Sequence, residues 1–456
     1  MPVPKALATM AIPTVISQLI NLVYNIVDTY FIGRTGNSDM VAAVTLAFTL
    51  FMMTIAFSNL FGTGGGSLMA RLIGRGKPEE AKKVCAFSFY GAAVVAVAYS
   101  IVVLLLLEPI LTLFGASENT MGFAKQYVWL VVIIGNLPVI LSLTLSHLLR
   151  NTGYSKQAST GLSIGGVLNI LLDPLLMFVL LPDGMEVFGA ALATMLSNVV
   201  SFVYLLIVLL RLSKKKDAPL GLKLSDAKAV ARDELKELFS VGVPSAILTG
   251  LFDVANVFLN ALMAKHGDPQ LAAVGIVMKA ERLPNAINLG VCQGMLPIVA
   301  YNYSSDNHKR MSSVISTARL WGLVIAAVSI VLFELCASPL LSIFMNTSPE
   351  MTAEGVEKAA ATIAFGVEFI RLRALASPFQ FLNYHTSFCM QAMGDGKGTL
   401  VHAVFRELIF YIPLMYLLNA LFGQNGLASA MIFGEALGAA FALILLRVWM
   451  KRKTNR

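Results

Sequence analysis

The chain has 456 residues, of which 57% are hydrophobic and only 13% are charged. Soluble proteins of this length carry about a quarter of their residues as charges. The composition therefore excludes an ordinary soluble protein and predicts a chain that crosses a membrane many times. Lys5 leads directly into an apolar run that is too long for a signal peptide, so no cleavable signal is expected.

About 20 apolar residues are needed to cross the hydrocarbon core of a bilayer. The sequence contains twelve runs of that kind, and it predicts an all-α polytopic membrane protein with twelve transmembrane helices. Pro and Gly interrupt several runs, which membrane helices tolerate when their neighbours satisfy the freed backbone groups. The predicted spans are residues 6–33, 40–70, 84–107, 123–148, 157–181, 187–211, 237–264, 271–300, 311–335, 360–391, 398–420 and 426–449.

Lys and Arg gather in the second loop, in the sixth loop and in the C-terminal tail, whereas the odd-numbered connections hold few of them. By the positive-inside rule, both termini and every even-numbered loop are predicted to be cytoplasmic. The net charge of +8 is then a topology signal, and no nucleic-acid partner is expected. Within the sixth loop, the stretch SDAKAVARDELKELF is expected to form a short amphipathic helix at the cytoplasmic surface.

The two halves of the chain resemble each other at an offset of about 230 residues. PILTLF at 109–114 matches PLLSIF at 339–344, and Gly64 matches Gly294. Six spans per repeat is an even number, so the halves share one orientation and predict two pseudo-symmetric six-helix bundles, an arrangement found in transporters. The predicted domains are an N-terminal lobe, a cytoplasmic linker and a C-terminal lobe, over residues 1–211, 212–236 and 237–456.

Polar side chains follow one face of the first span. Gln18, Asn21, Asn25 and Asp28 are spaced i, i+3, i+7 and i+10, which places them on the same side of a helix. The predicted orientation puts Asp28 in the outer half of the membrane.

The fifth span carries Asn169 and Asp173, four residues apart and just before Pro174. Asp173, together with Thr194 of the sixth span, is predicted at a depth similar to that of Asp28, and Asn136 of the fourth span lies nearer mid-depth. A carboxylate in the membrane costs several kcal/mol unless it is paired or solvated, and intramembrane acids are functional by default. Since no basic residue of the first half is placed to pair with these acids, we predict a cation or proton site. The alternative is that they are structural hydrogen-bonding groups.

The second half is polar in a different way, because acids and bases alternate along its spans. Two interpretations stay open there, internal salt bridges and a substrate-lining role. Arg406, near the cytoplasmic start of its span, is expected to extend toward the interface. Met53, on the second span, is a candidate for an adaptable drug cavity, with ordinary packing as the alternative.

Several chemistries find no support in the sequence. The four cysteines show no CxxC pairing, the five histidines are scattered, and neither GxxxxGK[ST] nor HExxH occurs. We therefore expect no enzyme, no nucleotide-driven motor and no resident cofactor.

Four stretches carry a resemblance to a known family over essentially the whole chain. They are IPTVISQLINLVYNIVDTYFIGRTG at 12–36, GGVLNILLDPLLMF at 165–178, QGMLPIVAYNYSS at 293–305 and FRELIFYIPLMYLL at 405–418. In this order and spacing the chain resembles the multidrug and toxic compound extrusion (MATE) family, and among its branches the prokaryotic DinF-like and MepA-like transporters.

The resemblance implies export of organic, often cationic, compounds by antiport with H+ or Na+. It also implies that Asp28, Asn169 and Asp173 form a cation site in the N-terminal lobe, with Thr194 in the sixth-helix position. In other branches the C-terminal lobe holds a cation site on the seventh and tenth helices. Here Asp253 or Glu281 would contribute, but the tenth span has Asn383 rather than a matching acid.

The sequence therefore predicts a monomeric antiporter in the cytoplasmic membrane of a prokaryote, which exports small organic cations by alternating access of two bundles. Pro13 and Pro174 are the expected bend points. The rival interpretations are a lipid-linked oligosaccharide flippase of the same superfamily, a membrane enzyme and a passive channel. H+ and Na+ both remain open as the coupling ion, with Na+ possible at Asp28, Asn169 and Asp173. The candidate substrate-binding residues are Gln18, Asn21, Asn25, Met53 and Asn136.

Overall fold

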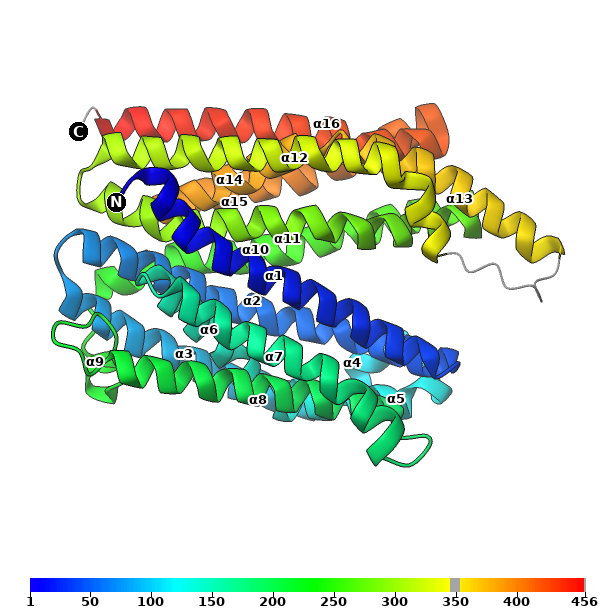
Figure 1. Ribbon diagram of the computed structural model, residues 1–456, viewed down its shortest axis with the longest axis horizontal. Coiled ribbons are helices and arrows are strands. Elements are labelled where there is room, and N and C mark those ends of the chain that lie inside the picture. Colours follow the sequence, from blue (N-terminus) through cyan, green and yellow to red (C-terminus); the bar gives the residue numbers. More distant parts are fainter. Residues whose placement is uncertain (345–352, 455–456) are drawn as a thin grey trace. The chain divides into compact units, whose positions relative to one another are not determined.

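The computed structural model describes residues 1–344 and 353–454, and the regular structure in these two ranges is entirely helical (Figure 1). Long helices alternate with short connections, as expected of a polytopic membrane protein. In the first half the helices are α1 (Val3–Arg34), α2 (Ser38–Gly74), α3 (Pro78–Leu105), α4 (Leu107–Leu113), α5 (Glu118–Val128), η1 (Trp129–Ile134), α6 (Asn136–Asn151), α7 (Ser155–Leu175), η2 (Leu176–Leu180) and α8 (Glu186–Leu212).

After a connection that contains α9 (Leu224–Lys228), the second half continues with long helices and a few short ones. They are α10 (Arg232–Met263), η3 (Ala264–His266), α11 (Asp268–Ser304), α12 (His308–Phe344), α13 (Ala353–Ala374), α14 (Ser377–Met393), α15 (Gly396–Val404), η4 (Phe405–Tyr411) and α16 (Ile412–Thr454).

In the described ranges, nine helical segments are long and apolar enough to cross a membrane, or ten if the bent pair formed by residues 118–134 and 136–151 is one span. One segment, Gly396–Met450, has 55 residues. At 1.5 Å per residue it is more than twice the thickness of a bilayer core. Gly423 interrupts it with a left-handed φ of 59°, at the boundary between the predicted eleventh and twelfth spans. The predicted tenth span is divided between α13 and α14.

The predicted linker helix differs from the observed one. Helix α9 has five residues, a break follows at residues 229–231, and the rest of the expected amphipathic segment is the first part of α10. The connection is nevertheless packed against α3, because Leu220 is fully buried and the Tyr90 hydroxyl donates a hydrogen bond to the Leu222 carbonyl at 2.9 Å.

Two compact units divide the chain. The first, unit 1, comprises Met1–Ile247, Gln293–Val314 and Gln391–Gly396; the second, unit 2, comprises Leu248–Cys292, Ile315–Met390 and Lys397–Arg456. Unit 1 therefore contains α1 to α9 together with the predicted cytoplasmic ends of several second-half helices. Each unit has its own apolar core: one in unit 1 is built around Leu68, Leu148 and Leu205, and the core of unit 2 around Phe369 and Met415.

Close contact between α2 and α10, within unit 1, depends on glycine. A Cβ built on Gly64 would lie 2.6 Å from the Leu238 carbonyl oxygen and 2.9 Å from the Gly242 Cα. A Cβ on Gly242 would overlap with the carbonyl oxygen of Leu60. The two backbones approach so closely that neither position has room for a side chain, and small residues are the usual means of such packing between membrane helices.

We expect Gly242→Ala to destabilise the protein, because the obstacle is a backbone carbonyl that cannot rotate away. Gly250→Ala is the matched control on the same helix, since a Cβ there meets nothing within 4 Å. In a helix interior, Gly→Ala without a clash adds about 0.5–1 kcal/mol of stability. Thermal unfolding of the two purified variants checks the prediction, and equal stability of Gly242→Ala and wild type would contradict it.

Candidate functional site

Asn169 and Asp173 lie on the last turns of α7, and both are buried. Their spacing of four residues places them on one face of the helix, and the Asn169 amide donates a hydrogen bond to Asp173 Oδ1 at 3.1 Å. Directly after Pro174, which cannot donate a backbone hydrogen bond, the α-helix gives way to the π-helical stretch η2. Short π-helical stretches occur frequently at functional sites.

Thr194 comes to the same place from α8. The Asn169 amide also lies 3.4 Å from Thr194 Oγ1, and Thr194 is 6% exposed. Close approach of η2 and α8 depends on Gly189, where a Cβ would lie 2.9 Å from the Leu176 carbonyl oxygen. The structure thus brings together three of the four residues predicted for the cation site.

Asp28 reaches this group from α1, which packs along α7 at Gly166. The charge of Asp28 acts on Asp173, and both carboxylates act on the buried Tyr127 of α5. Tyr127 also hydrogen-bonds to Thr194. Sequence reasoning missed Tyr127, because a tyrosine in a predicted span has no signal that separates it from ordinary packing.

Unsatisfied oxygen atoms mark this cluster. Asp28 Oδ1, Asp173 Oδ2 and Asn169 Oδ1 are all buried and have no hydrogen-bond partner. Among the ion pairs of the described residues, none involves Asp28 or Asp173. Buried polar atoms are normally hydrogen-bonded, and orphaned ones call for an explanation such as a bound ion or proton. The cluster therefore offers oxygen ligands and negative charge without a protein counter-charge.

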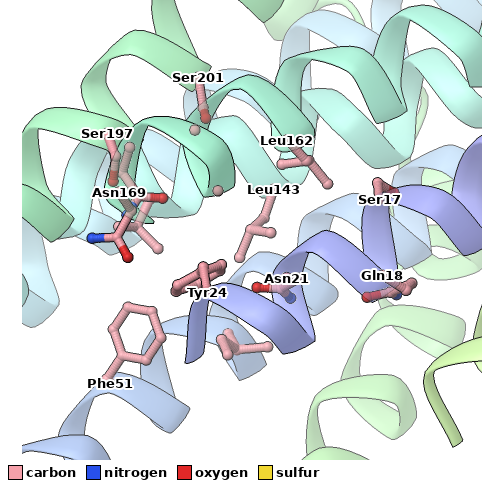
Figure 2. Close-up of a pocket in the computed structure, with 15 residues that line it drawn as sticks. Ser17, Gln18, Asn21, Tyr24, Phe51, Leu143, Leu162, Asn169, Ser197 and Ser201 are labelled. Carbon is pink, nitrogen blue, oxygen red and sulfur yellow. The ribbon is translucent and has the colours of Figure 1, made fainter. Parts of the chain in front are cut away.

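A cavity of about 80 Å³ adjoins the cluster in unit 1 (Figure 2). A cavity needs a volume of about 10–15 Å³ to hold a water molecule, whereas binding sites for drug-sized molecules have volumes of about 300–1,000 Å³. The space therefore suits water or a small ion rather than a drug. Its walls come from α1, α2, α6, α7 and α8, and its polar lining consists of Ser17, Gln18, Asn21, Tyr24, Asn169, Ser197, Asn198 and Ser201.

Figure 2 shows Tyr24 and Asn21 on the α1 side of this cavity, with Asn169 and Ser197 across from them. Gln18 and Asn21 were predicted from the polar face of the first span. Tyr24 and Ser197 were not, because their contribution depends on how three helices meet.

Three candidate substrate-binding residues are placed elsewhere. Asn25 bonds to the Asn21 carbonyl oxygen one turn back, at 2.7 Å. Asn136 is fully buried, and its amide donates to the Ala96 carbonyl oxygen of α3 at 2.8 Å. Met53 is 55% exposed. None of the three lines the cavity of Figure 2, and a substrate role for them stays a prediction.

Of the two interpretations left open for the second half, internal salt bridges are present in the structure. Arg373 of α13 binds Glu281 of α11 with both its Nε and Nη2 atoms, each at 2.7 Å. Glu281 therefore already has its counter-charge and is poorly suited to hold a cation. The other acid expected in a C-terminal cation site, Asp253, has a side chain outside the described residues.

The expectation that Arg406 extends toward the membrane interface is wrong. Its side chain is 2% exposed, and its guanidinium binds the Glu435 carboxylate, with Nε at 3.0 Å from Oε2. The Cζ atom of the Arg406 guanidinium lies over the Tyr384 ring, 5.0 Å from the ring centroid. A buried partner 29 residues away in sequence holds the cation, and the sequence contains no local signal of that pairing.

These features define a multi-pass, all-helical membrane protein with acidic side chains inside a helical bundle. Comparison with known proteins agrees: the MatE family profile matches residues 13–175 and 244–417, and the chain belongs to this family.

Individual relatives extend the likeness over the full length. The multidrug export protein MepA of Staphylococcus saprophyticus is 30% identical over 451 residues, which is 99% of this chain and 95% of that protein. A crystal structure of MATE in complex with MaL6 has a TM-score of 0.91 at 23% identity, covering 100% of this chain and 98% of the other. The outward-facing conformation of a multidrug resistance MATE family transporter gives 0.90 at 23% identity, with the same coverage. The solved structures therefore share the fold.

Proposed function

We propose that this protein exports organic, chiefly cationic, compounds from the cytoplasm by antiport with H+ or Na+. The observation that carries the proposal is the pair of acids Asp28 and Asp173. Each has one buried oxygen without a hydrogen-bond partner, and neither takes part in an ion pair of the described residues. An intramembrane carboxylate in that state needs a cation or a proton. Full-length similarity to relatives named multidrug export proteins supports drug export as the work that this ion drives.

In this mechanism the bound ion links two conformations. Binding of H+ or Na+ at Asp28 and Asp173 neutralises the cluster and rearranges α1, which favours release of the drug outside. Loss of the ion restores the negative cluster and favours uptake of a cationic drug from the cytoplasm. A ligand shifts a conformational equilibrium only through its different affinity for the two states, so the ion must bind one state more tightly than the other. The protein acts as a monomer in a prokaryotic cytoplasmic membrane, with both termini inside.

Oxygen chemistry supports either ion. Asp28 Oδ1, Asp173 Oδ2, Asn169 Oδ1 and Thr194 Oγ1 form a donor set that suits a hard cation, and a carboxylate alone suffices for a proton. The acids of this site favour cationic cargo over the anionic lipid-linked sugars that a flippase carries.

Dye extrusion from proteoliposomes tests the proposal, with the pH gradient and the Na+ gradient imposed separately. We expect one gradient to drive uphill dye movement and its collapse by an ionophore to stop it. Equal movement with no gradient would indicate a passive channel and would overturn the proposal.

A further inference from the structure

Unit 2 contains a second group of buried charges, which the proposed mechanism does not use. Arg406 and Glu407 lie on the π-helical stretch η4, and Glu435 lies on α16. Arg406 and Glu407 are each 2% exposed, and Glu435 is 5% exposed. Charged side chains are almost never buried to this degree without compensation.

Glu435 is the hydrogen-bonded partner of Arg406. Its two carboxylate oxygens accept hydrogen bonds from Nε and Nη2 of the guanidinium, in the bidentate geometry that stabilises an ionised carboxylate. The Asn383 amide donates a further bond of 2.6 Å to Glu435 Oε2. Glu435 is therefore the principal ion-pair partner of Arg406.

Glu407 has only a longer ion-pair contact with the same guanidinium. Its Oε1 atom lies 3.5 Å from Arg406 Nε, too far and without the geometry for a hydrogen bond. The same atom is buried and lacks any hydrogen-bond partner in the described part of the chain. An ionised Glu407 would share this guanidinium with Glu435 and would keep one buried oxygen without a hydrogen bond.

The surrounding titratable groups do not supply the missing charge. On α11 and α13, Glu281 and Arg373 neutralise each other. Tyr384 of α14 and Tyr411 of η4 are neutral phenols. His402 of α15 has both ring nitrogens in use, with Nδ1 2.9 Å from Ser387 Oγ and Nε2 2.9 Å from Asn383 Oδ1. Neither ring nitrogen touches a carboxylate.

One guanidinium thus faces two carboxylates, and a full negative charge in excess is costly at this degree of burial. We propose that Glu407 binds a proton in this conformation and is a proton site of the second half, separate from Asp28 and Asp173. A proton suits this position better than a metal ion, because the described residues contain no group of three or more His, Cys, Asp or Glu side chains that could hold a metal. These acids lie on the eleventh and twelfth predicted spans, whereas Asp253 and Glu281 lie on the seventh and eighth.

Glu407 also lies where a conformational change can act on it. Its helix is π-helical from Phe405 to Tyr411, and such stretches are less regular than the α-helix and frequent at functional sites. A small shift of η4 against α16 would let Glu407 compete for Arg406 and release its proton. The proton site itself does not rest on the proposed export function; only its part in coupling does.

Infrared titration of the purified full-length protein tests the inference through the C=O stretching band of a protonated carboxylic acid. The starting protein is the double variant Asp28→Asn/Asp173→Asn, which removes the acids of the first half. We expect a carboxylic acid band that Glu407→Gln abolishes, with the loss of one titrating proton per molecule. Because the measurement needs no transport, failure of the proton site and failure of the export proposal are distinguished.

Two further variants keep the test decisive. Glu435→Gln should also abolish the band, because it frees Arg406 to pair with an ionised Glu407. This result is informative even if Glu407→Gln does not fold. Glu334→Gln, in the exposed pair with Arg371, should leave the band unchanged. A band that survives both Glu407→Gln and Glu435→Gln, or a proton found on His402 as imidazolium, would overturn the inference.

Discussion

Export is expected to fall to the protein-free background when Asp173 is replaced by Asn, while the protein still folds and inserts. The amide has the size of the carboxylate and keeps the contact with Asn169, but it carries no charge and binds neither H+ nor Na+ tightly. Asp28→Asn is expected to have the same effect, because the orphaned oxygen of Asp28 belongs to the same cluster. Dye extrusion from proteoliposomes under an imposed ion gradient measures the loss.

Asp183→Asn is the control, since Asp183 lies exposed in the loop after η2 and should transport normally. Drug binding to the detergent-solubilised variants separates loss of coupling from loss of the binding site. Wild-type export by both Asp28→Asn and Asp173→Asn would refute the coupling site.

A second large effect is expected on stability in unit 2. Arg373→Gln leaves Glu281, whose side chain is 14% exposed, without its bidentate partner, and breaking a largely buried ion pair from one side costs about 3–5 kcal/mol. Arg371→Gln, two residues away on the same helix, removes an exposed pair with Glu334 and should cost about 0–1 kcal/mol. Thermal unfolding of the purified proteins compares the two variants directly.

The double variant Arg373→Met/Glu281→Met is expected to recover much of the lost stability, because it removes both charges instead of isolating one. If Arg373→Gln proved no less stable than Arg371→Gln, the prediction that the Arg373–Glu281 pair contributes more to the free energy of unfolding than the Arg371–Glu334 pair would be wrong.

Much of the N-terminal site was accessible from sequence because its signal is local. Asn169 and Asp173 share a helical face by their spacing, and the lack of nearby Lys or Arg made the acids anomalous in an apolar run. Tyr127 and Ser197 were not predicted, because polar residues of these types are common in membrane helices. Only the packing of α5, α7 and α8 against one another brings them to the site.

The second half shows the opposite case. Arg406 looked like a residue that reaches toward water, since its neighbours in sequence suggested the cytoplasmic start of a span. The structure pairs it with Glu435, which comes from another helix, and so isolates Glu407. Pairing between distant charges depends on which helix faces lie against each other, and hydrophobic periodicity does not specify that choice.

By itself, the sequence determined that this is an all-helical membrane protein, because the length of its apolar runs reflects the thickness of the bilayer directly. It also singled out Asp28 and Asp173, because an acid in hydrocarbon is costly wherever it lies. Only the tertiary structure decided which charges are neutralised: Glu281 and Glu435 form hydrogen-bonded pairs with guanidinium groups, and Glu407 shares the Arg406 guanidinium at 3.5 Å. Asp28 and Asp173 take part in none of the ion pairs of the described residues. The physical reason is that a counter-charge acts over a few ångströms in space, whatever its distance along the chain.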